Sequence, residues 1–280
     1  MSSAIHGANT PHAFPLLSLP EELLDTISKM TANYNGLSAS CRALTDMRRR
    51  AATADCEVTN FVSLQHMGGL TTLRATLTRP STSTYQTSLS GLSNIHLSIC
   101  EGVKDLTPLP GLTNLSHLDL SNCRSIVDLT PLSGLTALSI LNLKFCNRIE
   151  DLYPVSGLSN LSHLDLHFCE NIEDLTPISG LTNLSHLDLT NCQIIVKITA
   201  LSGLTSLLNL NFNLCDGIKS LTPLSGLSNL SLLDLHSCHI YSWHLPSLSG
   251  LTALSILYLH TCVGVDDLTP LSGLPLSPWP

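Results

Sequence analysis

Aromatic and charged residues are both scarce in this chain, and its basic residues are outnumbered by acidic ones. Of 280 residues, 4% are aromatic and 12% are charged, and the formal net charge is −8. Phosphate backbones are bound by clustered Lys and Arg, so this balance argues against a nucleic-acid binder. The one basic run, Arg48-Arg49-Arg50, is too short to reverse that argument.

Long apolar runs are also missing. No stretch approaches the roughly 20 consecutive apolar residues that span a bilayer. The first residues, MSSAIHGANTPHAF, lack the basic region and following apolar region of a secretory signal peptide. We therefore expect a cytoplasmic or nuclear protein with no membrane contact.

A regular spacing of glycine, cysteine and leucine dominates the rest of the chain. The glycines recur at intervals of 23 residues, with a single step of 24, at positions 111, 134, 157, 180, 203, 226, 250 and 273. Cysteines keep the same interval at positions 100, 123, 146, 169, 192, 215, 238 and 262. A fixed period of this length is typical of a stacked repeat protein.

One unit, starting at Asp105, reads DLTPLPGLTNLSHLDLSNCRSIV. Leu118 and Leu120 alternate with polar residues, the period of two expected of a half-buried strand. Pro and Gly in the following L-T-P-L-S-G-L segment preclude a long helix, so we expect an extended return leg or one turn of 3₁₀ helix. Each unit buries its apolar side only by stacking on its neighbours, which makes one parallel sheet.

This pattern, L-x-x-L-x-L-x-x-C, resembles the short leucine-rich repeats. The return leg is similar to the internalin-like class, and the cysteine to the repeats of eukaryotic F-box proteins. The resemblance covers residues 92–274. It implies an α/β leucine-rich-repeat solenoid: a right-handed superhelix with a parallel sheet on its concave face and short 3₁₀ or extended convex legs. We expect a degenerate capping repeat at 54–91 and a Pro-rich end at 275–280.

The segment before the repeats has a different pattern. After a disordered stretch at 1–13, residues 14–53 predict a small helical module, because Ser18 and Glu21 have capping-box spacing and apolar residues follow at helical spacing. The string LPEELLDTI, with Cys41-Arg42 further on, resembles an F-box, although the usual aromatic residue is absent. The alternative is a helical cap that covers the first strand.

The F-box resemblance implies a partner. In that family the motif docks on a Skp-family adaptor, and the matching residues here are Leu19, Pro20, Leu23 and Ile27. An F-box joined to leucine-rich repeats would make the chain a substrate receptor of a cullin-based ubiquitin ligase.

The repeated cysteines have two interpretations. Each follows a strand motif and does not form the C-x₂-C pairs of zinc sites. We therefore interpret them as buried apolar residues whose weak S–H donors reach backbone carbonyls, and not as nucleophiles or metal ligands.

The outward-pointing strand residues form three columns on the predicted concave face, which begin at His117, Asp119 and Ser121. The predicted partner contacts in these columns are His117, Asp119, Asn142, Lys144, His163, Asp165, His167, His186, Asp188, Asn211, Asp234, His236, Tyr258 and His260.

Four of these residues, His163, Asp165, His186 and Asp188, are expected to form a compact square on adjacent strands. The square could be a fortuitous metal site, a pH-sensitive contact or a polar binding surface. Nearby carboxylates would raise the pKa of the histidines.

The sequence shows no phosphate-binding glycine motif, H-E-x-x-H or G-x-S-x-G. We expect a monomeric protein-binding chain with no catalytic residue, cofactor or metal. The leading hypothesis is the ligase receptor, which binds its target through the concave face. The alternatives are a stand-alone binding scaffold of an expanded repeat family and, in a different class, a metal-dependent enzyme that uses the square.

Overall fold

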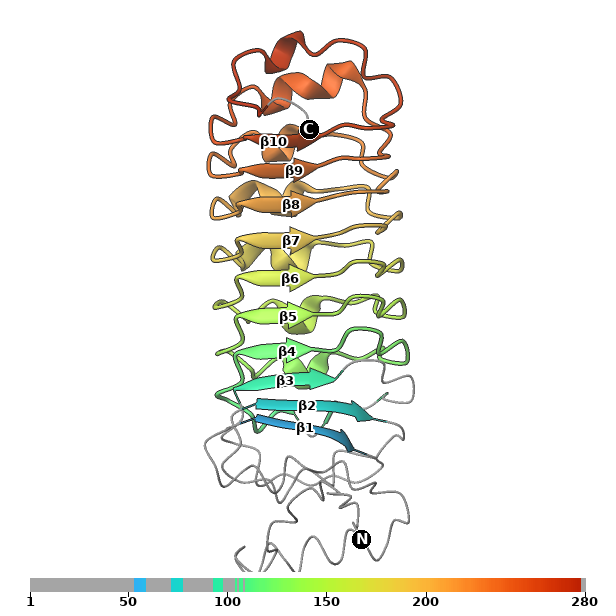
Figure 1. Cartoon of the computed structure of the whole chain (residues 1–280), viewed down its shortest axis with the longest axis vertical. Coiled ribbons are helices and arrows are strands. Elements are labelled where there is room, and N and C mark those ends of the chain that lie inside the picture. Colours follow the sequence, from blue (N-terminus) through green and yellow to red (C-terminus); the bar gives the residue numbers. More distant parts are fainter. Residues whose placement is uncertain are drawn as a thin grey trace, which may run out of the picture.

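A single parallel sheet runs the length of the stack (Figure 1). The computed structural model describes residues 53–58, 72–77, 93–97, 104, 106–107 and 109–277. The predicted disordered stretch, and the F-box-like module apart from Thr53, lie outside these residues. The ten strands are β1 (Thr53–Val58), β2 (Thr72–Leu77), β3 (Asn94–Leu97), β4 (His117–Asp119), β5 (Ile140–Asn142), β6 (His163–Asp165), β7 (His186–Asp188), β8 (Asn209–Asn211), β9 (Leu232–Asp234) and β10 (Ile256–Tyr258).

The strands pair in chain order and in constant register. His117 of β4 lies opposite Ile140 of β5, which lies opposite His163 of β6. Because the units have equal length, residues at the same place in successive units become direct neighbours across the sheet. The solenoid and its parallel sheet are therefore as predicted.

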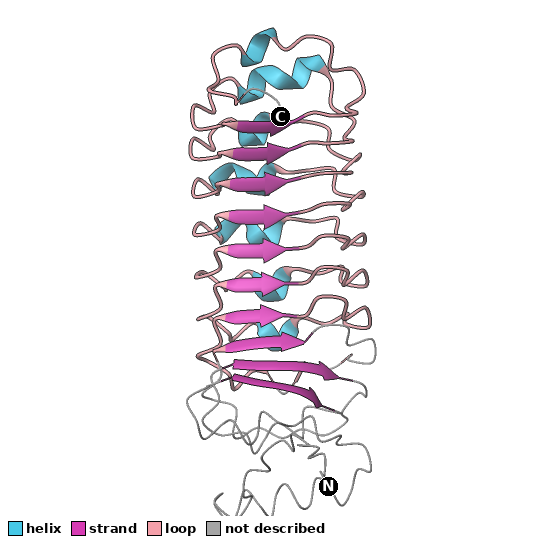
Figure 2. Cartoon of the chain, viewed as in Figure 1, coloured by secondary structure: helices cyan, strands magenta, loops and turns pink. Residues whose placement is uncertain are grey.

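Short 3₁₀ helices form the return legs and lie behind the sheet (Figure 2). They are η4 (Thr130–Leu132), η5 (Tyr153–Val155), η6 (Thr176–Gly180), η7 (Thr199–Gly203), η8 (Thr222–Leu224), η9 (Ser242–Leu248) and η10 (Thr269–Leu271). Of the two return legs that the sequence allowed, the 3₁₀ turn is the one that forms.

Leucines at every third position explain the choice of a 3₁₀ turn. The backbone N–H of Leu132 donates to the carbonyl of Leu129, Leu135 to Leu132, and Leu138 to Leu135. Residues three apart eclipse one another in a 3₁₀ helix, so these leucines share one side and all are buried. The same spacing that buries the side chains thus satisfies the backbone beneath them.

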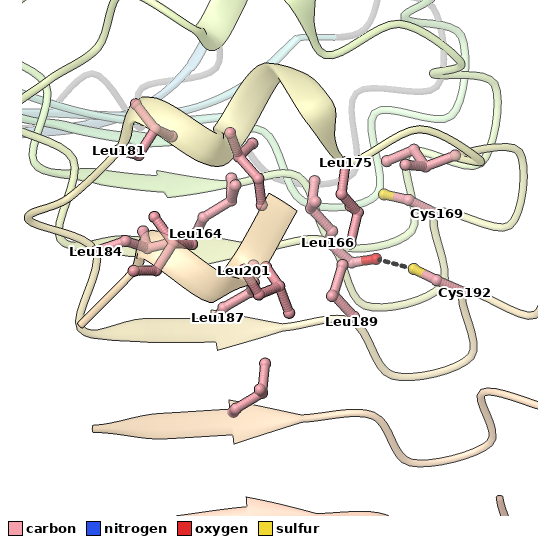
Figure 3. Packing of buried hydrophobic residues seen from close by; sticks show 14 of the residues in the cluster. Leu164, Leu166, Cys169, Leu175, Leu181, Leu184, Leu187, Leu189, Cys192 and Leu201 are labelled. Atoms are coloured by element: carbon pink, nitrogen blue, oxygen red, sulfur yellow. Dashed lines mark hydrogen bonds between the residues drawn. The ribbon is translucent and has the colours of Figure 1, made fainter. Parts of the chain in front are cut away.

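The core is a continuous set of leucine columns closed at one side by the cysteines (Figure 3). Cys192 Sγ donates to the carbonyl oxygen of Leu166 at 3.2 Å, and Cys169 Sγ to that of Leu143 at 3.1 Å. Similar thiol–carbonyl bonds recur at Cys146, Cys215, Cys238 and Cys262. The interpretation of these cysteines as apolar residues with a weak donor is confirmed.

Burial makes these thiols poor nucleophiles. It raises the pKa of Cys146 and of Cys192 to about 12, and it raises the pKa of Cys169 further still. All the cysteines whose side chains the structure describes are free of disulfides. Within the described part of the chain, no helix combines the length and apolarity that a membrane crossing requires.

Candidate functional site

The outward positions of β4–β10, together with the residues that follow each strand up to the cysteine, form a surface that we call the sheet face. The strand register places His163 opposite His186 and Asp165 opposite Asp188, so the predicted square exists. Its members are half-buried because each is flanked by neighbours from the strands above and below. Elsewhere on the sheet face, His117 near one end of the described stack and Leu214 after β8 are among the exposed residues.

The first column of the sheet face is organised by serine hydroxyls. Ser162 Oγ donates to the carbonyl of Ser139, and Ser185 Oγ to that of Ser162. These hydroxyls also lie 2.8 Å from the Nδ1 atoms of His163 and His186. The two imidazoles stack with 4.1 Å between their centroids, so the histidines are positioned by the serines and by each other.

The expectation that carboxylates raise the histidine pKa values is wrong for His163. Burial lowers the pKa of His163, and the positive charges that His186 and His117 would carry lower it further. For His167 burial and Lys144 lower the pKa, and they outweigh the opposing effect of Asp188 and Asp165. Desolvation at half-buried positions therefore decides the direction.

The aspartates of the second column have a structural role that the sequence analysis did not predict. Asp165 Oδ1 accepts the backbone N–H of His167 at 2.9 Å, and Asp188 Oδ1 accepts that of Thr190 at 2.8 Å. Asn142, Asn211 and Asp234 make the same contact in their own units. Asp and Asn favour this side-chain turn most strongly, which explains why the column carries one or the other from Asp119 to Asp234.

Burial also affects the charge of this column. It raises the pKa of Asp165, and the neighbouring carboxylate of Asp188 raises it further, against the lowering effect of the hydrogen bond from His167. Two carboxylates held side by side in a sheet repel each other, and a cationic partner group would relieve that repulsion.

Residues of the third column differ in how far a partner could reach them. Thr190 is only 3% exposed, and its Oγ1 is one of two buried side-chain atoms without a partner among the described residues. His167, by contrast, follows β6, is half-buried and approaches Asp188, with 3.9 Å between Nδ1 and Oδ1. Position in the column does not by itself make a residue available.

Lys144 and His167 of the third column lie close to two phenylalanines that the sequence analysis did not single out. Phe145 and Phe168 lie with 4.9 Å between ring centroids, and His167 lies 5.4 Å from Phe145 and 4.7 Å from Phe168. Lys144 Nζ lies 5.4 Å from the Phe145 ring centroid. We call these four residues the aromatic cluster.

The two phenylalanines occupy backbone positions that disfavour them. Phe145 has φ of 61° and Phe168 has φ of 59°, in the left-handed region, where the corresponding residues Asn122 and Asn191 are of a better suited type. Their N–H groups donate to the carbonyls of His167 and Thr190 in the next unit, which fixes that backbone. The signal in the sequence was a large aromatic residue at a place where two other units carry Asn and two more carry Ser237 and Thr261.

The part of the chain that the structure describes contains no cluster of metal-binding side chains. No group of three or more His, Cys, Asp or Glu side chains there could hold an ion. The His163 and His186 rings are engaged with each other and with serines, and the carboxylates of Asp165 and Asp188 with backbone N–H groups.

The comparisons with known proteins concern the repeats. Residues 113–158 match the family described as leucine-rich repeats (2 copies). No curated protein matches the chain. Among solved structures, internalin C2 of Listeria monocytogenes is 28% identical, with a TM-score of 0.56 over 74% of this chain and 79% of the internalin.

Two further structures are similar at lower identity. An internalin of the same organism (inlF) is 23% identical, with a TM-score of 0.61 over 84% of this chain and 78% of its own. A TDR receptor is 20% identical, with a TM-score of 0.52 over 72% of this chain and 37% of its own. These two show the fold alone. The chain is a leucine-rich-repeat protein with internalin-like repeats, and the comparisons give no support to the F-box resemblance.

Proposed function

We propose that this chain is a protein-binding scaffold and that its partner binds the sheet face around the aromatic cluster. This proposal takes the stand-alone scaffold in preference to the ligase receptor. It assigns the chain no catalytic role, because an open sheet face does not exclude water from reacting groups.

One observation carries the proposal: Phe145 and Phe168 are large apolar residues that are only half-buried, outside the core, in strained backbone positions. A left-handed conformation costs a non-glycine residue on the order of 1 kcal/mol. Neither ring belongs to the buried core, so core packing does not account for that cost. Strain combined with surface aromatics is typical of binding sites, where a few rings supply much of the affinity.

The surroundings of the cluster suit a protein surface. His167 of the cluster approaches Asp188, and Lys144 Nζ lies 5.4 Å from the Phe145 ring centroid, so apolar and charged groups of both signs occur together. Charged groups around an apolar centre are the usual anatomy of a protein interface. Stacked strands provide a rigid platform, so little side-chain ordering is left to oppose binding.

The test places a photo-crosslinking amino acid at Phe168 and, as the control, at Tyr153. Tyr153 lies on η5 behind the sheet and is 72% exposed. In extracts of the source cells, we expect a defined protein to crosslink from position 168 and not from position 153. No crosslinked protein at position 168, or the same proteins from both positions, would overturn the proposal.

A matched variant sharpens this test. Phe145→Asn with Phe168→Asn removes both rings but installs the residue found at the same place in other units, Asn122 and Asn191. The fold should be kept, because Asn tolerates positive φ better than Phe. Capture of the same protein should be lost, and retained capture would count against the aromatic cluster.

The ligase-receptor hypothesis remains a second candidate because of the string LPEELLDTI. Its residues Leu19, Pro20, Leu23 and Ile27 lie outside the described residues. Co-purification with a Skp-family adaptor tests it, with Leu23→Asp plus Ile27→Asp as the matched variant. If the parent chain binds no adaptor, the hypothesis is wrong, while the scaffold proposal is unaffected.

A further inference from the structure

A second surface lies away from the sheet face, on the return legs that lead to η6 and η7. There the chain encloses an open groove of about 750 Å³. Its main walls are formed by Glu150, Glu173, Asp174, Ile194, Val196 and Lys197. None of these residues belongs to the three columns or to the aromatic cluster.

The groove occurs where one unit departs from the repeat. In other units the residue before the return-leg leucine is Asp128, Asp151, Asp174 or Asp267, and its Oδ1 accepts the N–H two residues on. In this unit Lys197 takes that place, and Ala200 replaces the proline found near the start of η6. The polar turn of the repeat is thus absent here.

Two aliphatic side chains are exposed as a result of the same departure. Ile194 is 45% exposed and Val196 is 40% exposed, and both line the groove. The preceding unit carries Asn171 and Glu173 at these places. Asn171 Nδ2 bridges to the carbonyl of Asn147 at 2.8 Å, and Ile194 has no amide with which to bridge its own unit to the one before. The bond that Asn171 makes therefore has no counterpart at Ile194, although Asn191 Nδ2 donates to Glu170 Oε1 at 2.9 Å between the same two units.

The wall that carries Ile194 is held firmly from the other side. A Cβ atom added to Gly217 would lie 2.4 Å from the carbonyl oxygen of Ile195 and 2.7 Å from that of Gln193. The backbone of residues 193–195 therefore packs directly on Gly217, a contact that no larger residue allows. Because this wall is packed against the next unit, the groove belongs to the fold and does not depend on a mobile side chain.

The charge of the groove is negative. It contains the carboxylates of Glu150, Glu173 and Asp174 and the single ammonium of Lys197. Hydrogen bonds from Thr176 lower the pKa of Asp174 and keep it ionised. The chain as a whole carries a net charge of −8, so its longer-range field has the same sign.

We propose that this groove is a second docking site and that its occupant is an extended, basic segment of a partner protein. Aliphatic side chains of the segment pack on Ile194 and Val196, and flanking Lys or Arg groups pair with Glu150 and Glu173. Charge complementarity selects the basic segment over an acidic one. The proposal goes beyond the sheet face, because the two surfaces share no residue.

The test uses the full chain and a defined probe, a fluorescein-labelled peptide Gly-Lys-Arg-Leu-Ile-Arg-Lys-Gly. A second peptide carries Glu at the four basic positions. In fluorescence anisotropy the basic peptide should bind, more weakly as salt is added, and the acidic peptide should not. No binding of the basic peptide, or equal binding of both peptides, would overturn the proposal.

Two variants locate the binding. Ile194→Asn with Val196→Gln removes both aliphatic side chains without adding charge to the groove and should weaken binding at least about ten-fold. Val127→Gln is the control, because Val127 occupies the place of Val196 in another unit, is 46% exposed and lies outside the groove. Equal loss in the control, or no loss in the double variant, would contradict the assignment.

A charge-reversal variant distinguishes a loss of the binding site from a loss of the fold. Glu150→Lys with Glu173→Lys should abolish binding of the basic peptide and create binding of the acidic one, a gain that unfolding cannot produce. Sedimentation of the parent chain tests whether a second copy of the chain occupies the groove instead. If the parent chain self-associates and the double variant at Ile194 and Val196 does not, the groove binds a second copy of this chain, and the proposal of a basic partner segment is overturned.

Discussion

The imidazole rings of His163 and His186 lie nearly parallel, with 4.1 Å between their centroids and 9° between their planes. They are opposite residues of β6 and β7, and each Nδ1 is within hydrogen-bond distance of the serine before it. Two protonated rings at this separation would repel each other, and this repulsion adds to burial in lowering the pKa of His163.

The first prediction concerns the titration of His163. Its pKa is lowered from 6.5 in the folded chain by burial and by His186. In an NMR titration we expect the His163 ring protons to shift below pH 6.5 in the parent chain. His186→Asn, which installs the residue type of Asn209 in the same column, should raise the pKa of His163. A pKa of His163 above that of an exposed histidine would contradict the stack's proposed effect.

The same shift predicts a direction for stability. Between the folded pKa of His163 and 6.5, the unfolded chain binds more protons than the folded chain. The contribution of His163 is therefore fully present above 6.5 and is lost as the pH falls to its folded pKa. Asp165 acts in the opposite sense at more acidic pH, because its raised pKa lets the folded chain bind a proton first. Chemical denaturation at several pH values, with His163→Asn for comparison, separates the two.

The second prediction concerns Leu214. This residue has φ of 63° and is 38% exposed, so it combines backbone strain with little packing. Leu214→Asn should stabilise the chain by about 0.5–1 kcal/mol, a rise in Tm of about 2 °C. Leu208→Asn is the control, since Leu208 is similarly exposed without a positive φ. If thermal unfolding shows equal changes for both variants, backbone strain is not the cause.

The third prediction concerns thiol reactivity. Thiolates are the reactive form, and burial raises the pKa of Cys146 and Cys192 to about 12. In the native chain we expect these thiols to resist alkylation at pH 8, while the partly exposed Cys262 is modified first. Mass spectrometry of digested, alkylated protein assigns each site. Rapid native labelling of Cys192 would contradict its place in the core, and labelling in denaturant is the positive control.

The fourth prediction concerns the close contact beneath the groove. Gly217→Ala would bring a methyl group within 2.4 Å of the Ile195 carbonyl oxygen, and should destabilise the chain by about 1–3 kcal/mol. Gly226→Ala is matched to it, because its nearest atom would lie 3.9 Å away. Denaturant unfolding should leave Gly226→Ala within about 0.5 kcal/mol of the parent chain. Equal destabilisation of both variants would show that Gly217 has no special contact.

Much of the fold follows from local patterns in the sequence. The alternation around Leu118 and Leu120 predicts the strand, and the interval between glycines predicts the register of the sheet. The role of the cysteines was also predictable, because a residue repeated at one place in every unit is more simply explained by packing than by chemistry. The 3₁₀ turn could have been chosen over an extended leg from the three-residue spacing of the leucines.

The sheet face was predictable only as a set of positions. The sequence placed Asp165, His167 and Thr190 outward, but Asp165 is engaged with a backbone N–H and Thr190 is almost fully buried. The aromatic cluster was overlooked because its phenylalanines follow the strands and do not belong to the predicted columns.

By itself, the sequence determined the repeat unit, the buried leucines and cysteines, and the parallel order of the strands, because each depends on spacing within one unit or on units of equal length. Only the tertiary structure decided the lowered pKa of His163, the contact between Phe145 and Phe168, and the packing of residues 193–195 on Gly217. These features depend on distances and desolvation between residues of neighbouring units, which side-chain shape sets and which no periodic pattern records.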